Sequence, residues 1–220
     1  MAGHKAVGVR VTSDLASAVK DAQVAVDFAL AADLESRARA VATAGCAWIL
    51  GTTGLSSLDR SAIDAAAKHV AVLASPNMSI AVQLLMRLVG EAARALPKDF
   101  DIEIHETHHR DKIDAPSGTA KRLGEIAAGA RGHALDENNL LRSQASRPRQ
   151  SGAVEFSVTR AGDIVGEHRV IFAGLGEQLV LEHRASDRMA FARGAIAAAV
   201  WIAGRPAGRY EMADVIDGKQ

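Results

Sequence analysis

The sequence has little cysteine, no excess of charge of either sign and no long apolar run. Of 220 residues, one is a cysteine, Cys46. A single thiol can form neither an internal disulfide nor a cysteine-only zinc site. Lys plus Arg and Asp plus Glu number 26 each, so the formal net charge is zero. A neutral chain lacks the basic surplus of a nucleic-acid binder, and we expect no nucleic-acid partner.

The longest apolar run, from Ala195 to Ala203, is about half of the roughly 20 residues that a membrane-spanning helix needs. The first residues also lack the apolar core of a secretory signal. We therefore expect a cytoplasmic protein with no membrane partner. Hydrophobic residues make up 48% of the chain, which is enough for an ordinary buried core in one large or two small domains.

The first part of the chain alternates short apolar segments with helical patterns. Ser13 resembles an N-cap, and Ser56 with Asp59 has the spacing of a capping box. The alternation predicts βαβ units and a parallel sheet that is covered on both faces. The predicted strands are 8–12, 24–28, 47–50 and 69–73, and the predicted helices are 14–19, 33–44, an Ala-rich segment after Ser56, and 80–96.

The pattern changes after Pro97. Residues 100–106 alternate with a period of two, which predicts a half-exposed strand. A helix is predicted over 119–130, and the polar stretch 132–152 is long enough to be functional or mobile. Three strands at 154–160, 164–173 and 178–185 are separated by short turns, which favours an antiparallel meander, and a last helix is predicted over 188–202.

These patterns predict two domains. The first is expected to comprise residues 1–79, with the C-terminal segment 189–220 packing back onto it, and the second residues 80–188. The first domain is expected to hold the parallel sheet, and the second to be α+β with a mixed, largely antiparallel sheet.

A short motif in the second domain invites a metal interpretation. His105-Glu-Thr-His-His109 matches H-E-x-x-H, which in zinc hydrolases places two histidines on one face of a helix. Here the preceding residues alternate as a strand does, and four strand residues would separate the two histidines by about 13 Å. One zinc ion needs both nitrogens at about 2.0–2.1 Å, so we expect no metal site.

The segment 106–119 gathers groups suited to proton transfer and anion binding. It reads ETHHRDKIDAPSGT and follows a predicted strand. Histidine can donate a proton near neutral pH, Lys112 supplies a compact positive charge, and the helix predicted after Ser117 offers unpaired N–H groups to an anion. A small anionic substrate that is protonated during the reaction fits these groups. A solvated polar loop, with Ser117 only capping the helix, is the plainer alternative.

The ordered pattern Glu106-x-His-His-x-x-Lys-x-Asp-Ala-Pro-Ser-Gly-Thr119 resembles the signature of the 4-hydroxy-tetrahydrodipicolinate (dihydrodipicolinate) reductase family of lysine and diaminopimelate biosynthesis. The resemblance extends over nearly the whole chain from about Gly8. Further segments that resemble the family in the same order are Gly51–Gly54, Ser75–Ser79, Arg160–His168 and Ala185–Ala195.

The resemblance implies roles for five residues of this segment. His108 would be the general acid and Lys112 its catalytic partner, which stabilises the charge that develops during transfer. His109, Gly118 and Thr119 would hold the carboxylates of a small dicarboxylate substrate.

The resemblance also implies NADPH or NADH as the cofactor, at the strand ends of a Rossmann-like domain. A hydride would pass from the reduced nicotinamide to the substrate ring while an adjacent atom gains a proton. The implied cofactor-binding residues are Gly51, Thr52, Thr53, Ser75, Pro76, Asn77 and Met78. The family's usual tetrameric state further implies a homotetramer, with the predicted meander at the subunit interface.

One family feature is missing from this sequence. The family begins with a strand, a glycine-rich G-x-x-G-x-x-G turn and a helix that together cradle the pyrophosphate. The present sequence has no such segment, so we expect an N-terminally truncated Rossmann-like sheet. Ala29 also stands where the family usually has threonine. The alternative to a working reductase is therefore a non-catalytic, oligomeric dicarboxylate-binding protein with an impaired nucleotide site.

Overall fold

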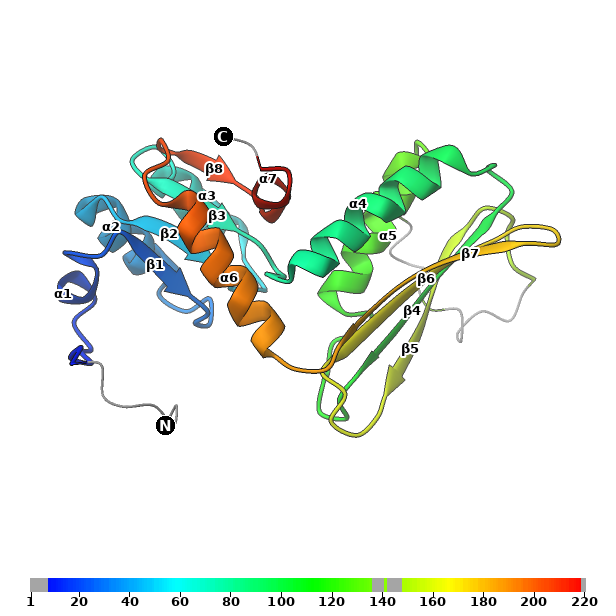
Figure 1. Cartoon of the computed structure of the whole chain (residues 1–220), viewed down its shortest axis with the longest axis horizontal. Coiled ribbons are helices and arrows are strands. Elements are labelled where there is room, and N and C mark those ends of the chain that lie inside the picture. The colour runs from blue at the N-terminus through cyan, green and yellow to red at the C-terminus, as the bar shows by residue number, and fades with distance from the viewer. Residues whose placement is uncertain (1–7, 136–140, 142–147, 219–220) are drawn as a thin grey trace. The chain divides into compact units, whose positions relative to one another are not determined.

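The structure, a computed structural model, describes residues 8–135, 141 and 148–218 (Figure 1). The fold divides into two compact units. Unit 1 comprises Met1–Ser75 with Ile196–Glu211, and unit 2 comprises Pro76–Ala195 with Met212–Gln220. Part of the irregular stretch predicted over 132–152, namely 136–140 and 142–147, lies outside the described residues.

Unit 1 is built on a parallel sheet in the order β1-β2-β3-β8 (Figure 1). The strands are β1 (Val24–Asp27), β2 (Ala47–Leu50), β3 (Ala71–Ala74) and β8 (Gly208–Tyr210). The four residues of β2 are all buried, as expected for a central strand of a parallel sheet. The first three strands end in register, because Asp27 pairs with Leu50 and Leu50 with Ala74.

Three helices of unit 1 follow the predicted pattern: α1 (Leu15–Val19), α2 (Leu34–Ala44) and α3 (Ser57–Ala66). The capping box predicted for α3 is confirmed, because Ser56 accepts from the Asp59 N–H and Asp59 accepts from the Ser56 N–H. Two details of the prediction are wrong. Residues 8–12 form no strand, and Asp14 rather than Ser13 caps α1, since its carboxylate accepts from the Ser17 N–H.

Unit 2 is built on a mixed sheet in the order β5-β4-β6-β7. Its strands are β4 (Asp101–His108), β5 (Val154–Arg160), β6 (Gly166–Ala173) and β7 (Gln178–Ala185). The strands β6 and β7 form the expected antiparallel hairpin. The predicted meander of β5, β6 and β7 is wrong, because β4 lies between β5 and β6 and pairs with β5 in parallel. The short connection between β5 and β6 favoured a hairpin of these two strands. It gave no sign that β5 pairs with β4, because parallel partners are not joined by a tight turn.

Two helices, α4 (Ile80–Ala95) and α5 (Gly118–Ala130), pack against one face of this mixed sheet (Figure 1). Ser79 and Ser117 cap them by accepting from the N–H groups of Val82 and Ala120. The core between helices and sheet holds large apolar side chains, among them Val82, Val89, Ile102, Ile104, Leu123, Phe156 and Phe172.

The chain ends in elements shared between the units. The helix α6 (Met189–Ile202) matches the last predicted helix, whereas β8 and the short helix α7 (Met212–Ile216) were not predicted. A three-residue strand and a five-residue helix carry too few residues for a recognisable period. The α/β class, with one parallel and one mixed sheet, is confirmed. The domain limits inferred from the sequence stay a prediction.

No helix within the described part of the chain is both long and apolar enough to cross a membrane.

Candidate active site

The period of strand β4 places two ionisable side chains on the buried face of the mixed sheet. Ile102 and Ile104 point into the core, and the same alternation brings Glu106 and His108 to that face. Glu106 is fully buried and His108 is 9% exposed. A carboxylate at such a position must be paired or hydrogen-bonded to be tolerated.

Both carboxylate oxygens of Glu106 are satisfied. Oε2 accepts from Nδ1 of His108 at 2.5 Å and from Nη1 of Arg160 at 2.9 Å. Oε1 accepts from Nη2 of Arg160 at 2.8 Å and from the Ser117 N–H at 3.0 Å. Burial alone would raise the pKa of Glu106, but the hydrogen bonds from His108 and Arg160 outweigh it and lower the pKa to about 2. Glu106 is therefore a fixed negative charge.

The charge on Glu106 decides which nitrogen of His108 carries the proton in the neutral ring. A carboxylate can only accept, so Nδ1 of His108 is the donor. The other nitrogen, Nε2, faces Gly166 on β6, where a Cβ would lie 3.0 Å away. Because glycine has no side chain, His108 keeps space at Nε2.

Lys112 lies on the loop that leaves β4. Its Nζ pairs with Oδ1 of Asp114 at 2.7 Å, and its side chain is 22% exposed. Burial would raise the pKa of Asp114, but the hydrogen bond and charge of Lys112 lower it. The ion pair leaves Lys112 partly open to solvent at the rim of the site.

The N-terminus of α5 lies beside these groups. Ser117 is the N-cap, and Gly118 is exposed at the first helical position. Thr119 accepts at Oγ1 from Nδ2 of Asn77, at 3.1 Å. The structure therefore brings Thr119 and Asn77 together, one from the predicted substrate segment and the other from a predicted cofactor loop.

His168 is buried on β6, where it is the register partner of Glu106. Its ring meets that of His108 edge-on, with centroids 5.2 Å apart, and its Nε2 shares a hydrogen bond with Oγ of Ser117. Burial lowers the pKa of His168 to about 3, with the neighbouring His108 adding to the shift. His168 is therefore neutral at ordinary pH.

A surface cavity of about 590 Å³ lies beyond His109. Three of its side chains can carry positive charge, namely His109, Arg110 and Arg188, and two are acidic, Asp111 and Asp163. A cavity with this lining suits a small anion that also carries hydrogen-bond donors.

The predicted cofactor residues of unit 1 follow β2 and β3, whose carboxyl ends are level. Gly51 lies against the ring of Phe28, where a Cβ would come within 2.4 Å, so a larger residue would require this ring to shift. Thr52 is buried and donates from Oγ1 to the Ala29 carbonyl at 2.8 Å. Thr53 is exposed and Ser75 is buried.

The remaining predicted cofactor residues begin unit 2. Pro76 is exposed, Asn77 is half-buried and Met78 is buried. The side chain of Asn77 also accepts from the Ser79 N–H at 2.9 Å, which fixes the turn before α4. The helix α6 passes close to this turn, because a Cβ at Gly194 would lie 1.7 Å from the Met78 carbonyl oxygen.

Comparison with known proteins identifies the family. The family described as "Dihydrodipicolinate reductase, N-terminus" matches residues 1–78, and "Dihydrodipicolinate reductase, C-terminus" matches residues 81–216. The chain belongs to this family. The 4-hydroxy-tetrahydrodipicolinate reductase of Ruegeria sp. (strain TM1040) is 46% identical over 97% of this chain and 80% of its own length. That of Methylocella silvestris is 47% identical over 98% of this chain and 80% of its own length.

Solved structures agree on the fold. A dipicolinate-bound dihydrodipicolinate reductase from Paenisporosarcina sp. TG-14 is 22% identical, with a TM-score of 0.69 over 86% of this chain and 71% of that chain. An amine dehydrogenase from Mycobacterium smegmatis, 12% identical, reaches a TM-score of 0.63 over 95% of this chain and 81% of that chain. The dihydrodipicolinate reductase fold is thus shared with a protein of another name.

Two side chains of this family member's site were missed as functional candidates in the sequence. Glu106 is the first residue of the motif Glu106–Thr119, and Arg160 is the first residue of the segment Arg160–His168. No role was predicted for either side chain. The signal for Glu106 was present, because it continues the apolar positions Ile102 and Ile104. Arg160 carried no such signal, since its contact with Glu106 depends on the parallel pairing of β4 with β5.

The H-E-x-x-H motif lies at the end of a strand rather than on a helix. Residues 105–108 are the end of β4, and Nε2 of His105 is 3.1 Å from Oγ1 of Thr159. No group of three or more potential metal-binding side chains occurs within 8–135, 141 and 148–218.

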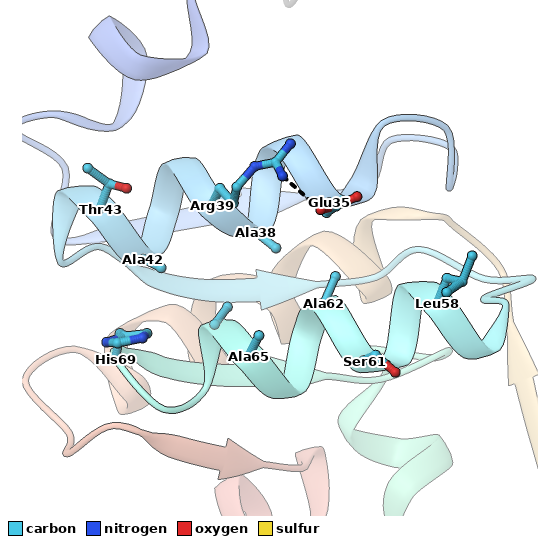
Figure 2. Close-up of a pocket in the computed structure, with 11 residues that line it drawn as sticks. Glu35, Ala38, Arg39, Ala42, Thr43, Leu58, Ser61, Ala62, Ala65 and His69 are labelled. Atoms are coloured by element: carbon cyan, nitrogen blue, oxygen red, sulfur yellow. Dashed lines mark hydrogen bonds and ion pairs between the residues drawn. The ribbon is translucent and has the colours of Figure 1, made fainter.

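Unit 1 contains a groove that is larger than the cavity at His109 (Figure 2). It has a volume of about 690 Å³ and runs between α2 and α3 of unit 1. Five of its eleven lining residues are alanine, and Leu58, His69 and the Glu35–Arg39 ion pair also line it. None of the residues predicted for the reductase site lines this groove.

Proposed function

We propose that this chain catalyses the reaction of its family, the NAD(P)H-dependent reduction of 4-hydroxy-tetrahydrodipicolinate to tetrahydrodipicolinate in lysine and diaminopimelate biosynthesis. The chain is then an oxidoreductase in which the substrate ring gains a hydride and a proton. The relatives that carry this name share nearly half of their aligned residues with this chain.

The observation that carries the proposal is the orientation of His108. Glu106 binds Nδ1, and Gly166 leaves space at Nε2. A general acid needs a nitrogen that can hold a proton and reach the substrate, and Nε2 is the nitrogen that Glu106 does not bind. His108 is thus the proton donor, and Lys112 stabilises the charge that develops on the substrate.

The substrate carboxylates are assigned to the positive groups around His108. The N-terminus of α5 offers N–H groups at Gly118 and Thr119, where the helix dipole also favours an anion. His109 lines the neighbouring cavity of about 590 Å³ together with Arg110 and Arg188. We assign one substrate carboxylate to each place, which would fix the ring relative to His108.

The strand ends of unit 1 fit the nicotinamide side of NADPH or NADH. Three parallel strands end level there, which is where open α/β sheets bind ligands. We assign cofactor binding to residues that follow β2 and β3 in the chain, namely Gly51, Thr52, Thr53, Ser75, Pro76, Asn77 and Met78. When bound, the reduced nicotinamide supplies the hydride. Unit 1 is accordingly assigned to nucleotide binding and unit 2 to the substrate.

Calorimetric titration of NADPH and of NADH, each with 2,6-pyridinedicarboxylate present, tests this function. We expect micromolar binding of at least one nucleotide, and nucleotide oxidation when the substrate replaces the dicarboxylate. Binding of the dicarboxylate without either nucleotide would overturn the proposal and favour a non-catalytic dicarboxylate-binding protein.

We assign the subunit interface of a homotetramer to the second face of the mixed sheet. No helix of unit 2 covers that face within the described residues (Figure 1). It presents half-buried Ile171 and Val180 beside charged side chains such as Glu103 and Arg169. A sheet face that is partly apolar and carries both charge signs can pair with a second copy of itself. We also assign the protein to the cytoplasm, because the proposed reaction consumes NAD(P)H.

A further inference from the structure

Arg160 uses its whole guanidinium within the protein. Its five N–H groups make five hydrogen bonds, two of them to the carboxylate of Glu106. The Lys112 carbonyl accepts from Nε at 3.1 Å, and the Asp114 carbonyl accepts from Nη2 at 2.6 Å. The fifth bond goes to the Thr159 carbonyl. Arg160 therefore has no free N–H to offer to a substrate.

These bonds join two parts of the site that the chain connects only through a loop. One part is Glu106, which holds His108 on β4. The other is the backbone of the loop at Lys112 and Asp114, from which the Lys112 side chain with its amine extends. Since a guanidinium is planar and rigid, the carboxylate and the two carbonyls are held in a fixed relative geometry.

Geometry also explains how Arg160 reaches both parts. The strand β5 runs parallel to β4, so Arg160 is the register partner of His108 at the strand ends. Its side chain is 18% exposed, and Glu106 is fully buried. An ion pair so well shielded, with two parallel N–H···O bonds, is stronger and more directional than an exposed one.

We propose that Arg160 is a positioning residue that couples the proton donor to the catalytic lysine, by fixing Glu106 against Nδ1 of His108 and by fixing the backbone of Lys112 and Asp114. This inference rests on the proposed function, because it assigns His108 and Lys112 to the reaction. Glu106 is the second member of this positioning pair. It holds the proton on Nδ1, so that Nε2 takes the proton which the reaction consumes.

The first test is the kinetics of Arg160→Lys. Lysine keeps the charge, but a single ammonium cannot bind both carboxylate oxygens and two carbonyls. We expect kcat to fall by about 10–100-fold, as for other groups that orient a catalytic histidine. The KM for substrate should change by less than about threefold, because Arg160 does not touch the substrate. A loss confined to KM would overturn the proposal.

The matched control is Arg131→Lys. Arg131 is 9% exposed and binds the carbonyls of Pro97, Lys98 and Phe100, near the opposite end of β4. This change should lower the free energy of unfolding without lowering kcat of the folded enzyme. An equal loss of kcat in both variants would mean that Arg160 is only structural.

A double-mutant cycle tests the coupling to the acid. If Arg160 acts partly through His108, then Arg160→Lys should lower kcat less in the His108→Ala background than it does alone, because only its contacts with the Lys112 and Asp114 carbonyls are then lost. Full additivity of the two losses would contradict a positioning role. His108→Ala alone should lower kcat by about 10²–10⁴-fold. If it leaves kcat unchanged, the proposed function fails.

A spectroscopic test does not depend on turnover. Nitrogen NMR of histidine-labelled protein distinguishes the two tautomers of a neutral ring, and the His108→Ala variant identifies the signal. We expect His108 to carry its proton on Nδ1, and Glu106→Gln and Arg160→Lys to produce a mixture of tautomers. A proton on Nε2 in the unmodified protein, or no change in either variant, would overturn the proposal whatever the activity.

Discussion

At the scale of single residues, His168 and Glu106 are buried beside each other and both have lowered pKa values, for different reasons. Burial lowers the pKa of His168 to about 3, because the charged ring would lose its hydration. The pKa of Glu106 falls to about 2 despite burial, because Arg160 and His108 bind its charged form. One site thus holds a histidine as neutral and a carboxylate as charged.

Both shifts make the folded state less stable in acid, in two overlapping pH ranges. The unfolded chain binds a proton at His168 near pH 6.5, and the folded chain does so only near pH 3. The stability that His168 contributes is therefore present above pH 6.5 and is lost as the pH falls toward 3. Glu106 acts in the same direction between about pH 4.5 and 2.

We expect the free energy of unfolding to fall by about 2 kcal/mol between pH 7 and pH 5 on account of His168. Urea unfolding at these two pH values measures the difference. His168→Gln should remove most of it, whereas exposed His133, changed in the same way, should leave it unaltered. An equal pH dependence in the unmodified protein and in His168→Gln would refute the assignment.

Residue types and order in the sequence were sufficient to select His108, Lys112 and Thr119 as candidates, and their proposed roles stay predictions. The sequence did not indicate how Glu106 is neutralised. Its partner Arg160 is 54 residues away, and no local pattern encodes a contact over that distance.

At the scale of elements, α6 approaches the turn before α4 so closely that it needs glycine at position 194. The Cβ of any other residue would lie 1.7 Å from the Met78 carbonyl oxygen, which is backbone and cannot turn away. A close helix–backbone contact of this kind fixes the turn that carries Asn77 and Met78.

Gly194→Ala should therefore destabilise the fold by about 1–3 kcal/mol or more, as expected for overpacking. Gly129→Ala is the control, because Gly129 lies in α5 and a Cβ there would meet nothing within 4 Å. The control should be neutral or stabilise by up to about 1 kcal/mol, since alanine favours the helix. Thermal unfolding measures both, and equal effects would contradict the predicted clash.

Periodicity predicted most elements, and its failures have identifiable causes. The run 8–12 has the apolar alternation of a strand but no strand beside it to pair with among the described residues. The opposite failure is β8, a strand of three residues that pairs with β3 in the sheet. In both cases pairing, which is a long-range property, decided whether a strand formed.

At the scale of the whole molecule, the expected assembly rests on the face of the mixed sheet that lies opposite α4 and α5. Val180 on β7 is half-buried and lies opposite Ile171 on β6, so these two side chains form an apolar centre among charged neighbours. Such a centre, surrounded by polar side chains, is the usual anatomy of a subunit interface.

Sedimentation should show a homotetramer, and Val180→Asp should dissociate it by placing a charge at the apolar centre. Leu58→Asp is the control, since Leu58 is 80% exposed on α3 of unit 1 and lies outside this face. If Leu58→Asp dissociates the tetramer and Val180→Asp does not, the interface is the groove between α2 and α3 instead.

The sequence by itself determined the βα order of unit 1, the faces of β4 and the motif that identifies the family. These properties depend on local period, on capping residues and on an ordered run of side chains, all of which are written along the chain. The tertiary structure alone decided that β5 pairs with β4 in parallel. That pairing places Arg160 at Glu106 and closes the network around His108, because strand partners are chosen by the packing of the whole sheet.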